Sequence, residues 1–300
     1  MSRFGITLAT LIAVLASATS ANAQTKDAED VRLTTPRGVR LAATYFEASK
    51  GKESPVIVML HGEGGNRKKW SAIAGGLQNT GYAVLTVDLR KHGDSEGVAT
   101  EGDKSSSAKL KPADYQGMYL DDMEAVKQFL MEKHHGGELN IRKTGFVAVG
   151  AIGAVALGAA AIDWLRKPYP DGPPSARTPR GQDVQTIVLI SPDATVKGMN
   201  LNTAIKTAKA GTVKFMVVVG KKDKGKKKSA DKLIKQMKGG IRKDEVEERV
   251  VLFEFDTKLN GEMMVAKDNR QILELLKRFH DLKLEPIDQP WRDRRSKLDR

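Results

Sequence analysis

The chain has 300 residues, no cysteine, and 50 lysine and arginine residues against 37 aspartate and glutamate residues, which gives a formal net charge of +13 at pH 7. The absence of cysteine excludes disulfide bonds and lipid attachment through a thiol, so the core alone must hold the fold. The positive excess suits an acidic partner, although general solubility is the simpler explanation.

The first 23 residues have the pattern of a signal peptide. Arg3 precedes an apolar run over residues 6–18, and Ala21-Asn22-Ala23 supplies the small-x-small pattern of a cleavage site. An N-terminal membrane anchor is the alternative, but the apolar run is too short to span a bilayer. We therefore expect an exported protein, periplasmic or extracellular, that begins at Gln24 and has no membrane span after cleavage.

Cleavage leaves about 277 residues with a net charge of 49 − 37 = +12, because the leader carries only Arg3. This length suits one α/β domain, which we place at residues 24–285. Residues 286–300 are charged and contain proline, which predicts a disordered tail. An exported protein meets little nucleic acid, so we expect small molecules or acidic polymers as partners and no nucleic acid.

Alternating and apolar runs predict a sheet. Two alternating runs around the turn Pro36–Gly38 predict an antiparallel hairpin at the sheet edge. Later runs are wholly apolar and alternate with helical segments, which is typical of buried parallel strands. The predicted strands are residues 31–35, 39–46, 55–60, 81–90, 144–149, 186–191, 213–219 and 248–255. The expected fold is a mostly parallel sheet with helices on both faces and no large lid.

Helical spacing of apolar residues predicts helices between these strands. The helices are expected at residues 67–78, 118–133, 153–164 and 201–209, followed by a last helix after residue 261. Residues 98–113 lack an apolar period and predict a surface loop, and the proline-rich residues 166–180 predict another. The adjacent His134 and His135 are a poor metal site and are expected to cap the helix before them.

A sharp turn from strand to helix is predicted within residues 144–157, where an apolar run breaks at glycines into an alanine-rich segment. Such a turn exposes one side chain. If Gly153 is the second glycine of the turn, that side chain belongs to Ala151, and Val149 replaces the first glycine. If Gly150 is the first glycine, it belongs to Ile152. No Ser, Cys or Asp lies between residues 145 and 162.

Three strings resemble those of α/β-hydrolases: His-Gly-Glu-Gly-Gly at 61–65, Asp-x-Arg-x-His-Gly at 88–93, and the turn at 144–157. The resemblance implies that the turn is a nucleophile elbow whose serine is missing. It also implies an oxyanion-hole-like group formed by Gly62, Glu63 and Ile152. Glu63 and Ile152 would supply the backbone N–H donors.

In the same family an acid follows a later strand as Gly-x-x-Asp, and a histidine follows the strand after it. Asp223 matches the acid, whereas Asn260-Gly261 stands where His-Gly is common. His280 lies about 20 Å or more along the last helix, too far for proton transfer. The vestigial triad positions are therefore Ala151, Asp223 and Asn260. This pattern resembles exported bacterial, planctomycete-like paralogues with a degenerate elbow.

Lysines crowd the segment around Asp223 and predict an anion-binding rim at the mouth of the pocket. They are Lys221, Lys222, Lys224, Lys226, Lys227 and Lys228. No metal site and no cofactor site is expected.

We hypothesise a non-catalytic protein, since neither an alanine nor an isoleucine can attack a carbonyl and an asparagine cannot relay a proton. Its vacated pocket or its lysine-rich rim would bind a ligand or partner. The rival hypothesis is an ester or peptidase-like hydrolase that uses Ser191 with Asp193 or His61. His61 is otherwise expected to steady its loop.

Overall fold

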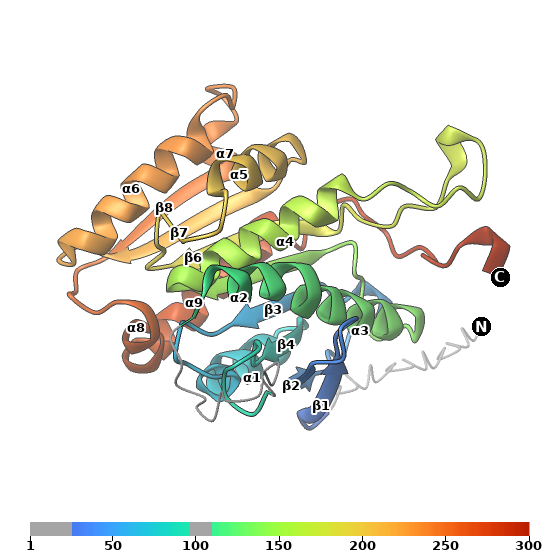
Figure 1. Ribbon diagram of the computed structural model, residues 1–300, viewed down its shortest axis with the longest axis horizontal. Helices are drawn as coiled ribbons and strands as arrows, with labels where there is room; N and C mark the ends of the chain where they lie inside the picture. The colour runs from blue at the N-terminus through green and yellow to red at the C-terminus, as the bar shows by residue number, and fades with distance from the viewer. Residues whose placement is uncertain (1–25, 96–109, 300) are drawn as a thin grey trace, which may run out of the picture.

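The computed structural model describes residues 26–95 and 110–299 (Figure 1). The predicted signal peptide, residues 1–23, and most of the predicted 98–113 loop lie outside these residues. The end of that loop is helical, because Pro112 begins a helix in the position that proline favours. Within the described part of the chain no helix has both the length and the apolar character needed to cross a membrane.

An eight-stranded sheet forms the centre of the molecule, in the order β1-β2-β4-β3-β5-β6-β7-β8. The pairs β1–β2 and β2–β4 are antiparallel and all others are parallel, which confirms the predicted fold class and the hairpin at the edge. The strands are β1 (Glu29–Thr34), β2 (Arg40–Phe46), β3 (Val56–Leu60), β4 (Ala83–Val87), β5 (Thr144–Val149), β6 (Val184–Ile190), β7 (Lys214–Gly220) and β8 (Val250–Phe255).

Helices cover both faces of the sheet, and each face has its own apolar core. The helices are α1 (Ser71–Gln78), α2 (Pro112–Gly117), α3 (Met123–His135), α4 (Gly153–Leu165), α5 (Leu201–Ala210), α6 (Lys224–Lys238), α7 (Val246–Arg249), α8 (Gly261–Lys267) and α9 (Asn269–Lys283). On one face α3, α4, α5 and α6 pack against side chains such as Val58. On the other face α1, α8 and α9 pack against its neighbour Ile57. The predicted single last helix is in fact two, divided at Asp268.

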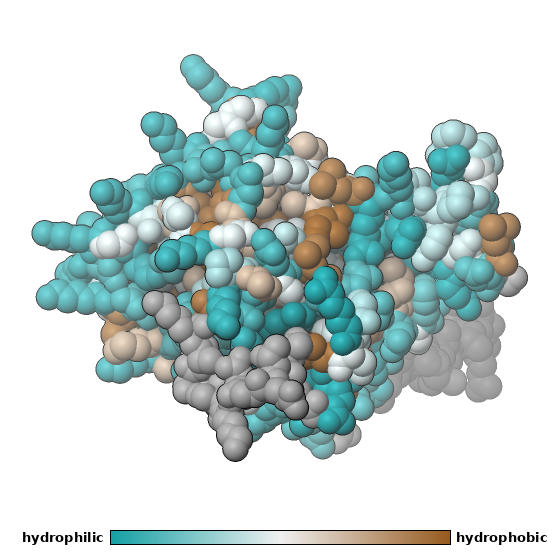
Figure 2. Space-filling view, in the orientation of Figure 1, coloured by the Kyte–Doolittle hydropathy of each residue, from teal (hydrophilic) through white to brown (hydrophobic). Residues whose placement is uncertain are grey.

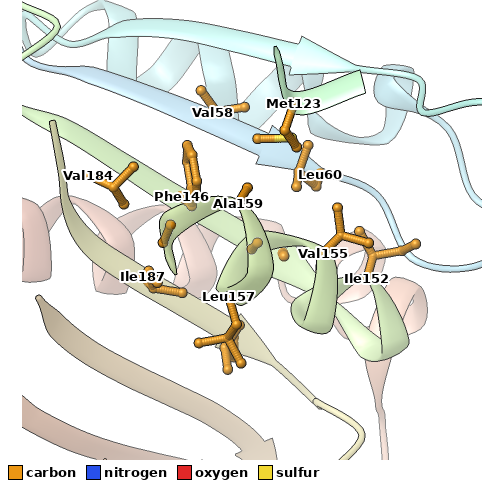
Figure 3. Close-up of a cluster of buried hydrophobic side chains, with 14 of the residues drawn as sticks. Val58, Leu60, Met123, Phe146, Ile152, Val155, Leu157, Ala159, Val184 and Ile187 are labelled. Carbon is orange, nitrogen blue, oxygen red and sulfur yellow. The ribbon is translucent and has the colours of Figure 1, made fainter. Parts of the chain in front are cut away.

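Helix α4 holds the centre of the larger core (Figure 3). Ten of its thirteen residues are buried, and most of these are glycine or alanine. Small side chains let the helix lie close to β5 and β6, so that Val155 and Leu157 reach the sheet. This packing fixes the direction in which the chain leaves β5.

The C-terminal tail is ordered against the body, and the prediction of a disordered tail is therefore wrong. Arg294 is 3% exposed and forms an ion pair with the buried Asp183. Asp183 also binds Lys127, and the indole of Trp291 donates a hydrogen bond to the carbonyl of His134 at 3.0 Å. Arg294, one of the charges that suggested a solvated tail, instead pairs with an opposite charge inside the fold.

Candidate functional site

The turn after β5 places a glycine at the exposed point. Val149 has extended geometry (φ −111°, ψ 135°), and Gly150 then has a φ of +60° before a short 3₁₀ turn leads into α4. This left-handed conformation, which glycine adopts without strain, is that of the turning residue of a strand-to-helix elbow. The residue at the turn is therefore Gly150. The two predicted alternatives, Ala151 and Ile152, lie one and two residues beyond it.

Space is open at this turn. A Cβ atom built on Gly150 would have Asp193 Oδ2, at 4.0 Å, as its nearest neighbour among the described residues. Ala151 is 8% exposed and lines the same space, whereas Ile152 is fully buried and belongs to the larger core, beside Val155 at the start of α4 (Figure 3). Ile152 therefore contributes no side chain to the site.

A pocket of ≈ 310 Å³ opens at the carboxyl ends of β3 and β5. These two strands are adjacent and parallel, with Leu60 opposite Ala148, so the loops that follow them meet. Open α/β folds bind ligands at this edge. The pocket is lined by Gly62, Glu63, Val149, Gly150, Ala151, Asp193, Lys226, Asn260, Gly261, Glu262 and Met263.

Asp223 and Asn260 are hydrogen-bonded, as an acid and a histidine would be in a triad. The Asn260 side-chain amide donates to Asp223 Oδ2 at 2.6 Å, and the backbone N–H of Lys226 donates to Asp223 Oδ1 at 2.9 Å. The N–H of Lys226 and then the Asn260 amide lower the pKa of Asp223, because both favour its charged form. Asn260 thus binds the Asp223 carboxylate as a histidine would, but its amide cannot accept and pass on a proton.

Glu262 fills the part of the pocket next to the loop after β3. Its Oε1 accepts a hydrogen bond from the backbone N–H of Gly62, and its Oε2 lies 3.3 Å from the ammonium of Lys69. A carboxylate therefore lies one residue from the N–H of Glu63, the predicted oxyanion donor. No sequence signal predicted this contact, because residues 62 and 262 are far apart in the chain and no motif joins them.

The Glu63 side chain turns toward α2, where the hydroxyl of Tyr115 donates to its Oε2 at 3.1 Å. The backbone of Glu63, rather than its carboxylate, is thus available to a ligand in the pocket.

The histidines of the loops are structural. His61 is fully buried; its Nδ1 donates to the carbonyl of Gly62 at 2.7 Å, and its Nε2 accepts the N–H of Leu89 at 3.1 Å. Burial and the neighbouring His92 lower the pKa of His61 to about 4, so it is neutral at pH 7. Both ring nitrogens are occupied in joining the loops after β3 and β4. His280 is buried beside Gly145, near the opposite end of β5 from the pocket.

Ser191, the nucleophile of the rival hypothesis, has a φ of +48° directly after β6. Its side chain is fully buried, and its hydroxyl has no hydrogen-bond partner among the described residues. Asp193 accepts a hydrogen bond from Lys226 at 2.7 Å. Among the described residues, neither Ser191 nor Asp193 is hydrogen-bonded to an imidazole that could take the proton of a serine.

The predicted lysine rim is not one loop. Asp223 caps α6, so the lysines from 224 onward are helical. Three of the six form ion pairs: Lys222 with Asp256, Lys226 with Asp193, and Lys227 with Asp231 and Glu254. Within the described ranges, no three His, Asp or Glu side chains are arranged to hold a metal ion.

Comparison with known proteins gives a consistent result. A family model described as the alpha/beta hydrolase fold matches residues 55–141. Among solved structures, an esterase from Pyrococcus furiosus has a TM-score of 0.58 at 16% identity, covering 86% of this chain and 92% of that chain. An esterase from Exiguobacterium antarcticum has a TM-score of 0.55 at 15% identity, covering 84% and 100%. Dienelactone hydrolase from Anabaena variabilis has a TM-score of 0.51 at 14% identity, covering 86% and 98%.

Proposed function

We propose a non-catalytic binding function for this chain, which has the α/β-hydrolase fold. The pocket at the ends of β3 and β5 would hold a small polar ligand without hydrolysing it. The observation that carries the proposal is Gly150: the residue at the elbow has no side chain, and therefore no atom that could attack a carbonyl.

The remaining groups support the same conclusion. A triad needs a base that accepts the proton of the nucleophile and an acid that orients that base. Here Asn260 binds Asp223 as a base would, but an amide does not take up a proton at neutral pH. The residue that hydrogen-bonds the acid is therefore one that cannot take up the proton of a nucleophile.

Glu262 adds an electrostatic argument. Hydrolysis of an ester passes through a negatively charged oxygen, which these enzymes stabilise with backbone N–H groups. In this chain a carboxylate already accepts from the N–H of Gly62, beside Glu63. A second negative charge a few ångströms away would be repelled, most strongly where water is excluded.

The pocket suits a small polar molecule. Lys226 and Asn260 offer polar side-chain groups, and Val149 and Met263 add two apolar contacts. We further propose that the protein is exported and acts in the periplasm or outside the cell, which rests on the leader-like residues 1–23.

The rival function is ester hydrolysis by Ser191. Its support is the strained backbone and the unpartnered hydroxyl of this residue, as far as the described residues go. It requires a base that the described residues do not place beside it.

The experiment is an assay of purified protein with p-nitrophenyl acetate and butyrate, together with labelling by a fluorophosphonate probe that reacts with activated serines. We expect no turnover above buffer and no label. Turnover or labelling that Ser191→Ala removes would refute the proposal. The double variant Gly150→Ser, Asn260→His is the positive control for the geometry, and we expect it to take the label.

Binding is measured separately, by ligand-detected NMR with butyramide as the probe. Ala151→Trp should abolish the signal, because the indole fills the pocket that Ala151 lines. An unchanged signal in this variant would place the ligand elsewhere.

A further inference from the structure

The outer face of α6 carries a row of unpaired positive charges. Lys224, Lys228, Lys232 and Lys235 are all exposed, and within the described part of the chain none of them forms an ion pair. Their spacing of four, four and three residues places them along one side of the helix. At 1.5 Å per residue the row is about 16 Å long.

This row differs from the lysines on the flanks of the helix. Lys226 binds Asp193 and Lys227 binds Asp231 and Glu254, so those charges are already neutralised. The opposite face of α6 is apolar and buried. Figure 1 shows α6 at the end of the molecule farthest from the C-terminus, and Figure 2 shows hydrophilic side chains projecting from that end.

The row is unfavourable for folding. Like charges four residues apart destabilise a helix by about 0.2–0.5 kcal/mol per pair. Lys224 also lies in the first helical turn, where the helix dipole disfavours a positive charge. A bound anionic partner would remove both penalties.

A polar groove of ≈ 500 Å³ lies beside this row, between α6 and the segment that leads into α5. Lys232 is its charged member, and its other polar side chains are hydroxyl and amide groups. They belong to Thr195, Asn200, Asn202 and Gln236. The side-chain oxygen of Gln236 is buried without a hydrogen-bond partner among the described residues.

We propose that the outer face of α6 and this groove bind an acidic polysaccharide, with the lysines contacting its sulfate or carboxylate groups and the amides contacting its hydroxyls. Neutral hydrogen-bonding groups beside a row of cations fit a sugar chain that alternates hydroxyl and acidic groups. The described residues of α6 and the groove include no aromatic side chain on which a nucleic-acid base could stack. They include no exposed apolar residue on α6 that could enter a membrane.

The test measures binding of heparin to the mature protein at 50 mM and 200 mM salt. Four lysine contacts should make the affinity about 100-fold weaker at the higher salt, because binding of the protein releases counterions from the heparin chain. Replacing all four lysines by alanine should weaken binding at 50 mM by about 100-fold and should raise the thermal stability, since the repulsion disappears. Gln236→Ala should weaken binding several-fold without changing the salt dependence.

The matched control replaces four other exposed lysines by alanine, so it has the same net charge as the α6 variant. These lysines are Lys167, Lys243, Lys258 and Lys267. It should keep heparin affinity within about threefold of the unmodified protein. Equal losses in both variants, or binding that salt does not weaken, would overturn the proposal. Tighter binding to single-stranded DNA or to anionic lipid vesicles than to heparin would overturn it in favour of that partner.

Discussion

Replacing Gly150 by alanine should destabilise the protein even though the space for the new methyl group is empty. The φ of +60° puts this residue in the left-handed region, and the nearest described atom to a Cβ added there would be Asp193 Oδ2 at 4.0 Å. The cost is therefore conformational rather than steric.

The magnitude follows from two opposing effects. A left-handed conformation costs a residue with a Cβ about 1–2 kcal/mol. The loss of glycine's freedom in the unfolded chain returns about 0.4–1 kcal/mol. The net loss for Gly150→Ala is about 1 kcal/mol, which in a domain of this size lowers Tm by about 2–4 °C.

Gly75→Ala is the matched control. Gly75 lies within α1, a Cβ added to it would meet no described atom within 4 Å, and its φ is not positive. Alanine there should raise stability by up to about 1 kcal/mol, because it is the better helix former. Urea unfolding followed by circular dichroism measures both variants. If Gly150→Ala is neutral or stabilising while Gly75→Ala behaves as expected, the elbow is not at residue 150.

Three other outcomes are expected. When the full chain is expressed with secretion in a bacterial host, mass spectrometry should find Gln24 as the first residue, and a retained leader would contradict export. Arg294→Met should cost about 3 kcal/mol because it leaves buried Asp183 short of a partner. Urea unfolding should show a much smaller loss for Arg295→Met, because Arg295 is exposed; similar losses in both variants would show that the tail is not anchored at Arg294. The folded-state pKa values of His61 and His280 are about 4, below the unfolded value of about 6.5, so the unfolded chain binds more protons between these limits. The free energy of unfolding should therefore be fully retained above pH 6.5 and should fall on acidification by about 2 kcal/mol per histidine at pH 5; urea titrations across this range measure it, and a flat profile would contradict the burial of neutral imidazoles.

The fold was predictable because its signals are local. Apolar runs such as residues 55–60 are strands because they are buried on both faces, and the glycines after them mark where each strand ends. The tail was mispredicted because a run of charges looks solvated until its partners are known, and Asp183 is more than a hundred residues away.

The site was predictable only in part. Asp223 and Asn260 follow predicted strands, and the structure brings them into hydrogen-bond contact. The elbow residue was predicted one or two positions too late, because three glycines and several alanines allow more than one frame. Only the backbone angle at Gly150 distinguishes between these frames. The helical start of the lysine segment was missed because four lysines near a helix N-terminus oppose the usual charge preference.

The Glu262 contact also bears on how such a protein can evolve. A single mutation that placed serine at position 150 would not complete a triad while Asn260 and Glu262 remained, and it would add the strain of a left-handed serine. On the proposed non-catalytic function, several substitutions would be needed together before any one of them gave turnover. Descent from a hydrolase, once these residues were in place, would run in one direction.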